Sequence, residues 1–557
     1  MTLHAPSATE SGPAAGTGTD AAETGADQVA AALDALGVRR VFAIASIHNL
    51  PVLRALRARG TTSIVTMRHE QGAVHAADGY ARATGELGVA VVSTGPGTAN
   101  AMGGLFEASF ASSRVLLITG QVETAYLGRG RGYIHEAENQ SDMLRAVCRS
   151  VSVPRRAADI GAEVLRLAGE AMTGRPRPVA LELPIDLQRA SAPALRPEPP
   201  VIARDPIDDA GAVETARSLL AARRPLIWAG GGVTGSGAAS ALAELAEAAQ
   251  VPVVTSREGR GALPEDHPLC LGCYPAVEPL RSYVESADLL LAVGTRFQMY
   301  PTDSWRLRLP ANLVHLDADP SVIGLNYPAR LPLVGDAALG LSQITGHLTA
   351  HRQDRTAYLA EGREALAAAR AAIGAQMGPD HEAICASIRR HLPRDGVVVR
   401  DATVPAYVWG DRVLPVLAPR TSIRPTAAGI GPGLPLAIGA ALGSGAPAVL
   451  IQGDGGFMLS VGELAAALQS GAHVIVCLFD DQGYGVLREI IRDSYGGAAH
   501  DVDLATPDFT ALAASFGVPG RRIADPASFD TEFAAAVARP GPTLLHIDMS
   551  ALAPINR

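Results

Sequence analysis

The sequence PAVLIQGDGGFMLSVGELAAALQSGAHVIVCLFDDQGY, residues 447–484, gives the clearest indication of the fold. An apolar strand at 447–451 leads into a Gly-Asp-Gly-Gly turn, and a small-residue helix follows at 461–469. A second apolar strand at 473–479 then ends in an acidic turn. Because the helix returns the chain to the starting edge of the sheet, the two strands run parallel. The stretch therefore predicts an α/β domain on a parallel sheet.

Two acidic residues follow these two strands, Asp454 after the first and Asp481 after the second. Neighbouring parallel strands lie about 5 Å apart, so both carboxylates can reach one ion at the edge of the sheet. Carboxylate oxygens suit Mg²⁺ or Ca²⁺, and the glycines around Asp454 let main-chain N–H groups approach an anion. A helix that we expect to begin near Ser460 points its positive end the same way. The pattern predicts a diphosphate site with a metal; the alternative is that both aspartates cap helices.

Two further units with the same rhythm precede this one, so we expect three doubly wound α/β domains with parallel sheets. The first and third units share a layout, in which a small-residue helix precedes a strand and a glycine-rich turn. A Pro-rich linker (192–206) and an Ala-rich helical connector (354–373) separate the units. The expected divisions are a disordered tail at 1–24 and domains at 25–190, 206–350 and 376–557.

The composition narrows the functions that are open to the chain. Its 557 residues include no lysine, so all 47 basic residues are arginine, which excludes lysine Schiff-base enzymes and P-loop NTPases. A net charge of −9 argues against a nucleic-acid binder. No apolar run approaches the roughly 18 residues of a membrane span. Five scattered cysteines indicate a reducing compartment, so we expect a cytoplasmic protein whose Cys270/Cys273 pair packs rather than binds zinc.

The Gly-Asp-Gly turn and its second acidic turn resemble the cofactor motif of the thiamine diphosphate (ThDP) enzymes of the acetolactate synthase and pyruvate decarboxylase superfamily. The resemblance covers about residues 27–550. It implies a pyrimidine-binding first domain, a central Rossmann-like domain and a diphosphate-binding last domain. It also implies ThDP and Mg²⁺ as cofactors, with the metal on Asp454, Asp481 and the carbonyl of Gly483. The cofactor-binding residues implied beside the metal are Gly453, Gly455, Gly456, Thr403 and Tyr484.

One position departs from the family's usual pattern. The chain has Asp480 where these enzymes usually carry asparagine. This places a further negative charge beside the diphosphate. We expect Asp480 to turn outward or to require a firmly held metal.

A second match lies in the first unit, at MRHEQGA, residues 67–73. It resembles the stretch around the family's catalytic glutamate, which implies that role for Glu70. A carboxyl group on the aminopyrimidine ring favours the imine tautomer, whose nitrogen takes the C2 proton of the thiazolium. In an apolar pocket such a carboxyl has a raised pKa, which suits proton exchange near neutrality. The alternative is a glutamate that the helix dipole favours at an N-terminus.

A third match is the glycine-rich run AGIGPGLP at 428–435. The resemblance implies that Ile430, after Gly429, props the cofactor in a bent conformation, and that the carbonyl of Ala428 accepts from the aminopyrimidine. Bending brings the imine nitrogen close to C2, which is a proximity effect. The alternative is a tight helix entry that needs glycines for its backbone alone.

Three residues bear on the substrate. His48 follows the first strand, and its position resembles that of the active-site histidine of benzaldehyde lyase and related carboligases. His135 stands where acetolactate synthases usually have a glutamine. Imidazoles at these positions could relay protons to the substrate oxygen. Gln121 matches a pocket glutamine of the family. His69 and His75 we interpret as structural.

These features favour a decarboxylase or carboligase, a C–C lyase, that acts on a 2-oxo acid or a 2-hydroxyketone with an aldehyde or ketone acceptor. The first alternative is an acetolactate synthase-type enzyme that joins two 2-oxo acids. A catalytically silent paralogue is a further alternative, which the presence of Glu70 beside a metal pair opposes. The family builds its active site between subunits, which implies a homodimer or homotetramer.

The central unit allows a different class of function. GGGVTG at 230–235 follows a strand and fits the dinucleotide pattern GxGxxG, so an NAD- or FAD-dependent oxidoreductase is a second alternative. No acidic residue follows at the distance expected for a ribose contact. In the resembled family this domain sometimes holds FAD and often holds no ligand, so FAD is possible but not expected, and we expect no redox use of flavin.

Overall fold

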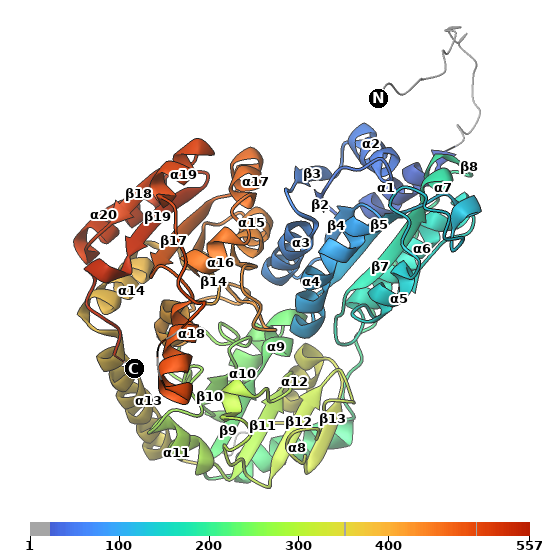
Figure 1. The fold of residues 1–557 in the computed structure, drawn as a ribbon. Coiled ribbons are helices and arrows are strands. Elements are labelled where there is room, and N and C mark those ends of the chain that lie inside the picture. Colours follow the sequence, from blue (N-terminus) through green and yellow to red (C-terminus); the bar gives the residue numbers. More distant parts are fainter. Residues whose placement is uncertain (1–22, 350–352, 497, 499, 557) are drawn as a thin grey trace, which may run out of the picture.

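The computed structural model describes residues 23–349, 353–496, 498 and 500–556, which form three α/β units on three parallel sheets (Figure 1). The predicted fold class is confirmed. Residues 1–22 of the expected disordered tail lie outside the described residues. Glu23–Thr24 form strand β1, which pairs with β8 (Ser191–Ala192), so the expectation of disorder was wrong for these two residues.

The first unit is a six-stranded parallel sheet in the order β3-β2-β4-β5-β7-β6, with helices on both faces. Strands β4, β5 and β7 in the interior of the sheet are buried throughout, as expected for a sheet that helices cover on both sides, whereas the edge strands β3 and β6 are partly exposed. The strands are β2 (Arg40–Ala43), β3 (Ser63–Thr66), β4 (Gly88–Val92), β5 (Val115–Gln121), β6 (Val151–Ser152) and β7 (Val179–Pro184). The helices are α1 (Gly25–Ala35), α2 (Leu50–Arg59), α3 (Glu70–Thr84), α4 (Pro96–Ala111), α5 (Gln140–Arg145), α6 (Ile160–Met172) and α7 (Ile185–Arg189).

The central unit is a five-stranded parallel sheet in the order β10-β9-β11-β12-β13. It follows a segment, 193–208, that has neither helix nor strand. Its strands are β9 (Pro225–Ala229), β10 (Val253–Thr255), β11 (Leu289–Val293), β12 (Leu313–Asp317) and β13 (Leu331–Val334). Its helices are α8 (Asp209–Ala221), α9 (Gly231–Ser236), α10 (Ala239–Ala249), α11 (Leu280–Glu285) and α12 (Ala337–Gly346), and the long α13 (Thr356–Met377) connects it to the last unit.

The third unit is again a six-stranded parallel sheet, in the order β15-β14-β16-β17-β19-β18. The strands are β14 (Val397–Arg400), β15 (Ser422–Ile423), β16 (Ala448–Gly453), β17 (Val474–Asp480), β18 (Gly520–Ile523) and β19 (Thr543–Asp548). The helices are α14 (Pro379–His391), α15 (Gly433–Ser444), α16 (Asp454–Met458), α17 (Glu463–Ser470), α18 (Gly485–Ile490), α19 (Phe509–Ser515) and α20 (Pro526–Ala538).

The first and third sheets have the same strand order, so the shared layout seen in the sequence extends to the whole sheet. In this correspondence β4 matches β16, and the helices that precede them, α3 and α15, match each other. These two helices pack together closely because glycines lie at their crossing. A Cβ on Gly439 would lie 1.8 Å from the carbonyl oxygen of Ala76, and one on Gly79 would lie 2.1 Å from that of Leu436.

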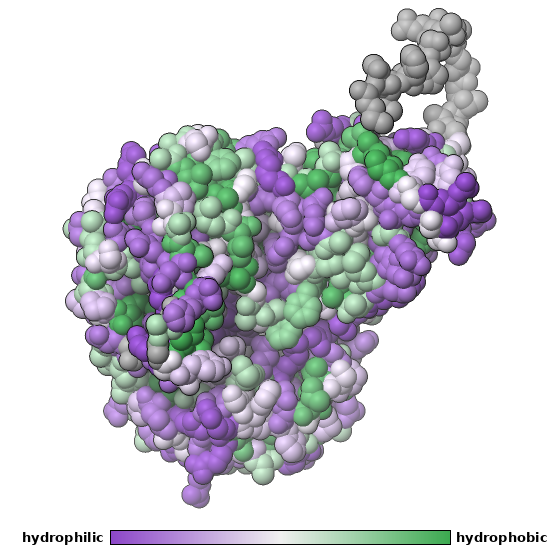
Figure 2. Space-filling view, viewed as in Figure 1, coloured by the Kyte–Doolittle hydropathy of each residue, from purple (hydrophilic) through white to green (hydrophobic). Residues whose placement is uncertain are grey.

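Two apolar cores cross the boundaries between units. One runs from Val74 and Tyr80 of the first unit to Leu434 of the third. The other joins Trp228 of the central unit to Trp409 of the third. The space-filling view shows mainly hydrophilic residues over the outer face, with apolar patches on the first and third units (Figure 2). Within the described residues, no helix combines the length and apolar character needed to cross a bilayer.

Candidate functional site

The carboxyl edge of the third sheet carries the acidic pair found in the sequence. Strands β16 and β17 are parallel neighbours with Gly453 opposite Phe479, so Asp454 and Asp481 leave the sheet at the same edge. The Asp454 side chain is completely buried, and neither carboxylate oxygen has a hydrogen-bond partner among the described residues. Burial and the negative charges of Asp481 and Asp480 raise the pKa of Asp454 to about 7.

These two carboxylates fit a divalent cation. A buried carboxylate without a hydrogen-bond partner is costly, and a bound cation removes that cost. No group of three or more His, Cys, Asp or Glu side chains in the described part of the chain could hold a metal, so further ligands would be main-chain oxygens and water. Arg488 lies 3.6 Å from Asp481 and also donates to the Asp481 carbonyl, which fixes the acidic turn.

Three glycines around Asp454 allow other side chains to approach. A Cβ on Gly453 would lie 3.1 Å from Oγ1 of Thr403, and one on Gly455 would lie 2.6 Å from a ring carbon of Tyr484. A Cβ on Gly456 would lie 3.2 Å from the Ile430 side chain. The structure therefore brings Thr403, Tyr484 and Ile430 close to the glycines around Asp454.

The loop that carries Ala428 and Ile430 is held by Asp401, a residue that the sequence analysis missed. Asp401 follows β14 and accepts hydrogen bonds from the main-chain N–H groups of Gly431 (3.1 Å) and Gly433 (2.7 Å). Burial raises the pKa of Asp401 above its usual value. Ala428 has a φ of 62° and Gly431 a φ of 99°, so the loop is tightly turned. An acid directly after a buried strand was the available signal.

Two details of this edge differ from expectation. The helix predicted at 461–469 is α17, which begins at Glu463, three residues after Ser460; a further short helix that the sequence analysis missed, α16, begins at Asp454 itself. Asp480 does not turn outward: its carboxylate lies 2.8 Å from Nε2 of His546 on the neighbouring strand β19.

The carboxyl edge of the first sheet carries Glu70 as the first residue of α3. Asn100 on α4 donates to its carboxylate at 3.0 Å. A Cβ on Gly97 would lie 3.1 Å from Oε1 of Glu70, so this glycine lets the start of α4 approach the carboxylate. The glycine-rich turn that follows β4 is thus the entry of α4, with Gly95 directly before its first residue.

His48 and His135 lie at the same edge with ring centroids 5.2 Å apart. His48 is buried and packs against Gly120. A Cβ added to Gly120 would lie 2.7 Å from the Cβ of His48. The carbonyl of His135 lies against Gly95. Among the described residues neither imidazole has a partner for Nδ1. Burial is the largest cause that lowers the pKa of His48, and the charges of His135 and Arg189 lower it further.

Gln121 lies behind the histidines in a buried polar network. Its Nε2 donates to Glu182 at 3.0 Å, and its Oε1 accepts from the N–H of Val122 at 2.8 Å. Gln140 donates to the same Glu182 oxygen at 2.9 Å and accepts from the N–H of Gly95 at 2.7 Å. Gln140 and Glu182 were not singled out by sequence, since they are 42 residues apart. The network fixes the glycine turn next to His135.

The two groups of residues remain separate within one chain. In the described ranges no hydrogen bond joins Glu70 or the histidines to Asp454, Asp481 or Tyr484. Each group lies at the carboxyl edge of its own sheet, the usual ligand-binding edge of open α/β folds. Within one chain, the two groups therefore lie at the edges of two different sheets.

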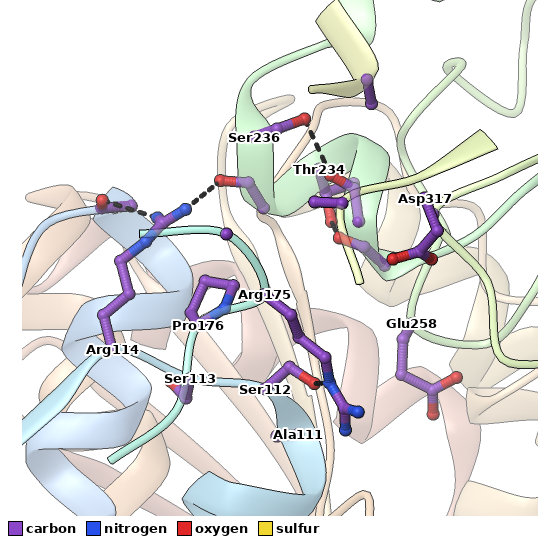
Figure 3. Close-up of a pocket in the computed structure, with 18 of the residues that line it drawn as sticks. Ala111, Ser112, Ser113, Arg114, Arg175, Pro176, Thr234, Ser236, Glu258 and Asp317 are labelled. Atoms are coloured by element: carbon purple, nitrogen blue, oxygen red, sulfur yellow. Dashed lines mark hydrogen bonds between the residues drawn. The ribbon is translucent and has the colours of Figure 1, made fainter. Parts of the chain in front are cut away.

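A cavity of about 520 Å³ lies between the central unit and the other two units (Figure 3). The dinucleotide-like turn 230–235 lines it through Gly231, Gly232, Thr234 and Gly235. Burial raises the pKa of Asp317, at the end of β12, to about 6. Asp317 is an acidic residue at the end of a strand, which is the type of residue that the sequence analysis sought after the GxGxxG turn. It was missed because it ends β12, which lies much further along the chain than the expected position. The arginines that line the cavity are Arg82, Arg114, Arg175, Arg204, Arg257, Arg260, Arg296, Arg420 and Arg424.

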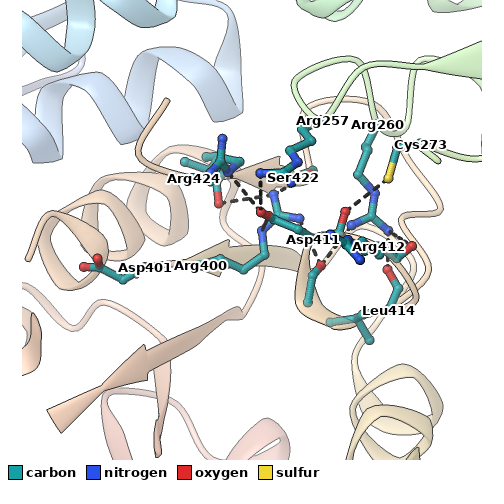
Figure 4. Close-up of polar contacts among 12 residues, drawn as sticks. Arg257, Arg260, Cys273, Arg400, Asp401, Asp411, Arg412, Leu414, Ser422 and Arg424 are labelled. Carbon is teal, nitrogen blue, oxygen red and sulfur yellow. Dashed lines mark hydrogen bonds and ion pairs between the residues drawn. The ribbon is translucent and has the colours of Figure 1, made fainter. Parts of the chain in front are cut away.

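A buried charge cluster joins this cavity to the third unit (Figure 4). Asp411 lies 3.3 Å from Arg424, 3.4 Å from Arg400 and 3.4 Å from Arg257. Burial alone would raise the pKa of Asp411, but the arginines bring it to about 2. Cys273 donates to the Asp411 carbonyl and is buried with Cys270, so these thiols pack as the sequence indicated.

Family models match the chain in three consecutive segments. They describe the N-terminal TPP binding domain, the central domain and the C-terminal TPP binding domain of thiamine pyrophosphate enzymes, over residues 23–143, 213–344 and 405–547. A Pseudomonas aeruginosa protein assigned the name 2-ketoarginine decarboxylase AruI is 34% identical, over 92% of this chain and 91% of its own. The chain belongs to the thiamine pyrophosphate-dependent enzymes. Thiamine pyrophosphate is ThDP, so the predicted family and cofactor are confirmed.

Other ThDP enzymes are similar along their whole length. The large subunit of Escherichia coli acetolactate synthase isozyme 2 is 31% identical, over 95% of this chain and 96% of its own. The X-ray structure of a candidate thiamin diphosphate-dependent enzyme from Mycobacterium smegmatis has a TM-score of 0.77 and 25% identity, over 94% of this chain and 99% of its own. Glu70 lies in the N-terminal match, and Asp454 and Asp481 lie in the C-terminal match.

Proposed function

We propose that this ThDP enzyme is a Mg²⁺-dependent decarboxylase or carboligase that acts on a 2-oxo acid or a 2-hydroxyketone. The observation that carries the metal is the buried Asp454 carboxylate, which lies beside Asp481 without a hydrogen-bond partner in the described chain. Asp454, Asp481 and the carbonyl of Gly483 would hold the Mg²⁺. The N–H groups around Gly455 and Gly456 would bind the diphosphate, together with Thr403 and Tyr484.

The remaining cofactor contacts come from two loops. Ile430 and Gly429 would support the bent conformation, the carbonyl of Ala428 would accept from the aminopyrimidine, and Glu70 would hold a proton at the pyrimidine ring nitrogen. When bound, ThDP would supply a carbanion at C2 that can add to a carbonyl, and its positively charged thiazolium ring would take up the electron pair released by C–C cleavage.

The histidine pair supports a reaction with proton transfer at the substrate oxygen. His48 is neutral over a wide pH range because its pKa is lowered, and its Nδ1 is free of partners among the described residues. His48 and His135 would therefore exchange a proton with the substrate oxygen, and Gln121 would orient the substrate from the network behind them.

A second copy of the chain would complete the active site. One chain separates Glu70 from Asp454, and apolar side chains near the two half-sites are exposed, including Ile47, Ile134 and Leu459. Burying such side chains against a partner favours association. A homodimer or homotetramer would place the Glu70 half of one chain over the Asp454 half of another.

The central cavity supports a bound nucleotide beside the reaction. Its glycine turn, arginine lining and the strand-end Asp317 suit an anionic ligand with hydroxyl groups, and 520 Å³ is typical of ligand pockets. We expect a structural rather than a redox role. The absorbance spectrum of the purified protein and analysis of the heat-released ligand test this, and a flavin reduced during turnover would contradict it.

The alternative function is an acetolactate synthase-type transferase, which the E. coli relative favours. The deciding experiment supplies ThDP and Mg²⁺ with pyruvate, benzoylformate or 2-ketoarginine, alone and with aldehyde acceptors, and measures CO₂ and hydroxyketones. The last donor is chosen from the name of the P. aeruginosa relative. Release of CO₂ with aldehyde or mixed hydroxyketone products supports the proposal. Acetolactate as the sole efficient product would overturn it in favour of the alternative.

A further inference from the structure

Each ThDP-binding unit sends one buried glutamate into the other unit of the same chain. Glu463, on α17 of the third unit, accepts from the main-chain N–H of Arg68 at 3.1 Å and of His69 at 3.0 Å. Glu107, on α4 of the first unit, accepts from the N–H of Thr426 at 2.6 Å and of Ala427 at 2.9 Å. Both glutamates are almost fully buried.

The two contacts are equivalent by topology. The helices α4 and α17 both lie in the connection between matching strands, β4 to β5 and β16 to β17. The segments that they hold follow the matching strands β3 and β15. Each segment ends directly before a residue proposed to contact the cofactor, Glu70 in one case and Ala428 in the other.

The local packing is arranged for these carboxylates. A Cβ on Gly72 would lie 2.2 Å from Oε1 of Glu463, so only a glycine admits the carboxylate at the start of α3. Glu107 is also paired with Arg82 at 2.7 Å, and Arg82 in turn donates to the carbonyl of Arg424 at 2.7 Å. Bonds from a carboxylate to main-chain N–H groups are charge-assisted, and they are strong when they are buried.

We propose that Glu463 and Glu107 are reciprocal positioning residues, which set Glu70 and the Ala428 loop by holding the main chain directly before them. The inference rests on the proposed roles of Glu70 and Ala428. In a dimer, one chain's Glu70 and its Asp454 half-site serve different active sites. The two glutamates therefore tie the geometry of one active site to that of the other through the interior of a single chain.

The first test uses the protein without cofactor, in the variants Glu463→Gln and Glu107→Gln. Amide hydrogen exchange is measured on peptides that cover 67–74 and 425–433. Glu463→Gln is expected to speed exchange about ten- to a hundredfold in the first peptide only, and Glu107→Gln in the second only, because each loses charge-assisted bonds. Unchanged exchange in both peptides, in folded variants, would overturn the proposal.

The matched control is Asp525→Asn. Asp525 also accepts from two main-chain N–H groups, those of Ala527 and Ser528, but it caps α20 at the outer part of the third unit. This variant is expected to leave exchange in both peptides and the catalytic rate unchanged. If it changed them as much as Glu463→Gln does, the effect would be general loosening, and the positioning role would be overturned.

The second test asks whether Glu463 acts on the Glu70 of its own chain. Heterodimers with two affinity tags pair a Glu70→Gln chain with a Glu463→Gln chain, or pair a Glu70→Gln, Glu463→Gln double variant with wild type. In the first heterodimer the intact Glu70 lies in the chain that carries Glu463→Gln, whereas in the second it lies in the wild-type chain. Exchange of the ThDP C2 proton with D₂O is therefore expected to be about tenfold slower in the first heterodimer than in the second. Equal rates would overturn the proposal.

A failure of the proposed function can be distinguished from a failure of the positioning role of Glu463 and Glu107. If the wild-type enzyme with ThDP and Mg²⁺ exchanged the C2 proton no faster than free ThDP, the proposed function would fail. The amide exchange of the cofactor-free variants would still show whether the glutamates hold their segments.

Discussion

At the scale of single residues, Asp454 carries a large electrostatic cost in the free protein. The carboxylate is buried, its oxygens have no hydrogen-bond partners in the described chain, and Asp481 and Asp480 are close by. Each of these features disfavours the charged form, which explains the pKa of about 7. The same arrangement becomes favourable when a divalent cation is present. The residue therefore lowers the stability of the free protein, and in return it would raise the affinity for the proposed metal.

Asp454→Asn tests this exchange because its two effects have opposite signs. The amide removes a buried charge, so the cofactor-free protein is expected to unfold at a higher temperature at pH 8. The same change removes a metal ligand, so the affinity for ThDP with Mg²⁺ is expected to fall about a hundredfold or more. Thermal unfolding with and without ThDP and Mg²⁺ measures both effects. If ThDP and Mg²⁺ raised the unfolding temperature of the variant as much as that of the wild type, the metal assignment would be contradicted.

His48 sets a second prediction at this scale, for the pH dependence of the reaction. Burial disfavours the imidazolium ion and lowers the pKa of His48, so the ring stays neutral at pH values where an ordinary histidine is protonated. The acid limb of kcat/KM is therefore expected below the usual histidine range. His48→Asn is expected to remove this limb and to lower kcat/KM about 10²- to 10⁴-fold. An acid limb that persists in the variant would assign it to another group.

At the scale of elements, the crossing of α3 and α15 fixes how the two ThDP-binding units meet. Gly439→Ala would place a Cβ 1.8 Å from the carbonyl oxygen of Ala76, so the helices must separate. Such overpacking costs about 1–3 kcal/mol, and the unfolding temperature and cofactor affinity are expected to fall together. In the control Gly374→Ala on α13, the Cβ meets nothing within 4 Å, so this variant is expected to gain about 0.5–1 kcal/mol. Equal unfolding temperatures in the two variants would contradict the close crossing.

The same scale shows what the sequence could and could not predict. Apolar runs predicted the strands. Because parallel neighbouring strands end at the same edge of a sheet, they also predicted that Asp454 and Asp481 lie at one edge. The short helix α16 was missed because Gly455 and Gly456 suggested a turn, whereas their backbone is helical. Contacts such as Glu463 to His69 span 394 residues, and no local pattern encodes such a packing of separate units. Asp401 was within reach, since it follows a buried strand as Asp454 does.

At the scale of the whole molecule, the matching sheets place the two proposed half-sites at the carboxyl edges of different sheets. Glu70 contacts Asn100 within its own unit, and the described residues show no bond from it to the Asp454 half-site. We propose that a second chain supplies the missing half, since the proposed chemistry needs both halves at one cofactor. In a C2 dimer the same pair of surfaces is used twice, so two equivalent sites form.

This arrangement predicts that two inactive variants restore activity when they share a dimer. Glu70→Gln and Asp454→Asn each damage both sites of their own homodimer. In a mixed dimer, the Glu70 of the Asp454→Asn chain meets the Asp454 of the Glu70→Gln chain, so one of the two sites is intact. Random mixing is therefore expected to recover about a quarter of the wild-type activity, measured by CO₂ release after co-expression. The double variant mixed with itself is the inactive control. Because each chain of the mixture keeps one defective half, a site formed within a single chain would recover no activity at all, and that result would refute the two-chain site.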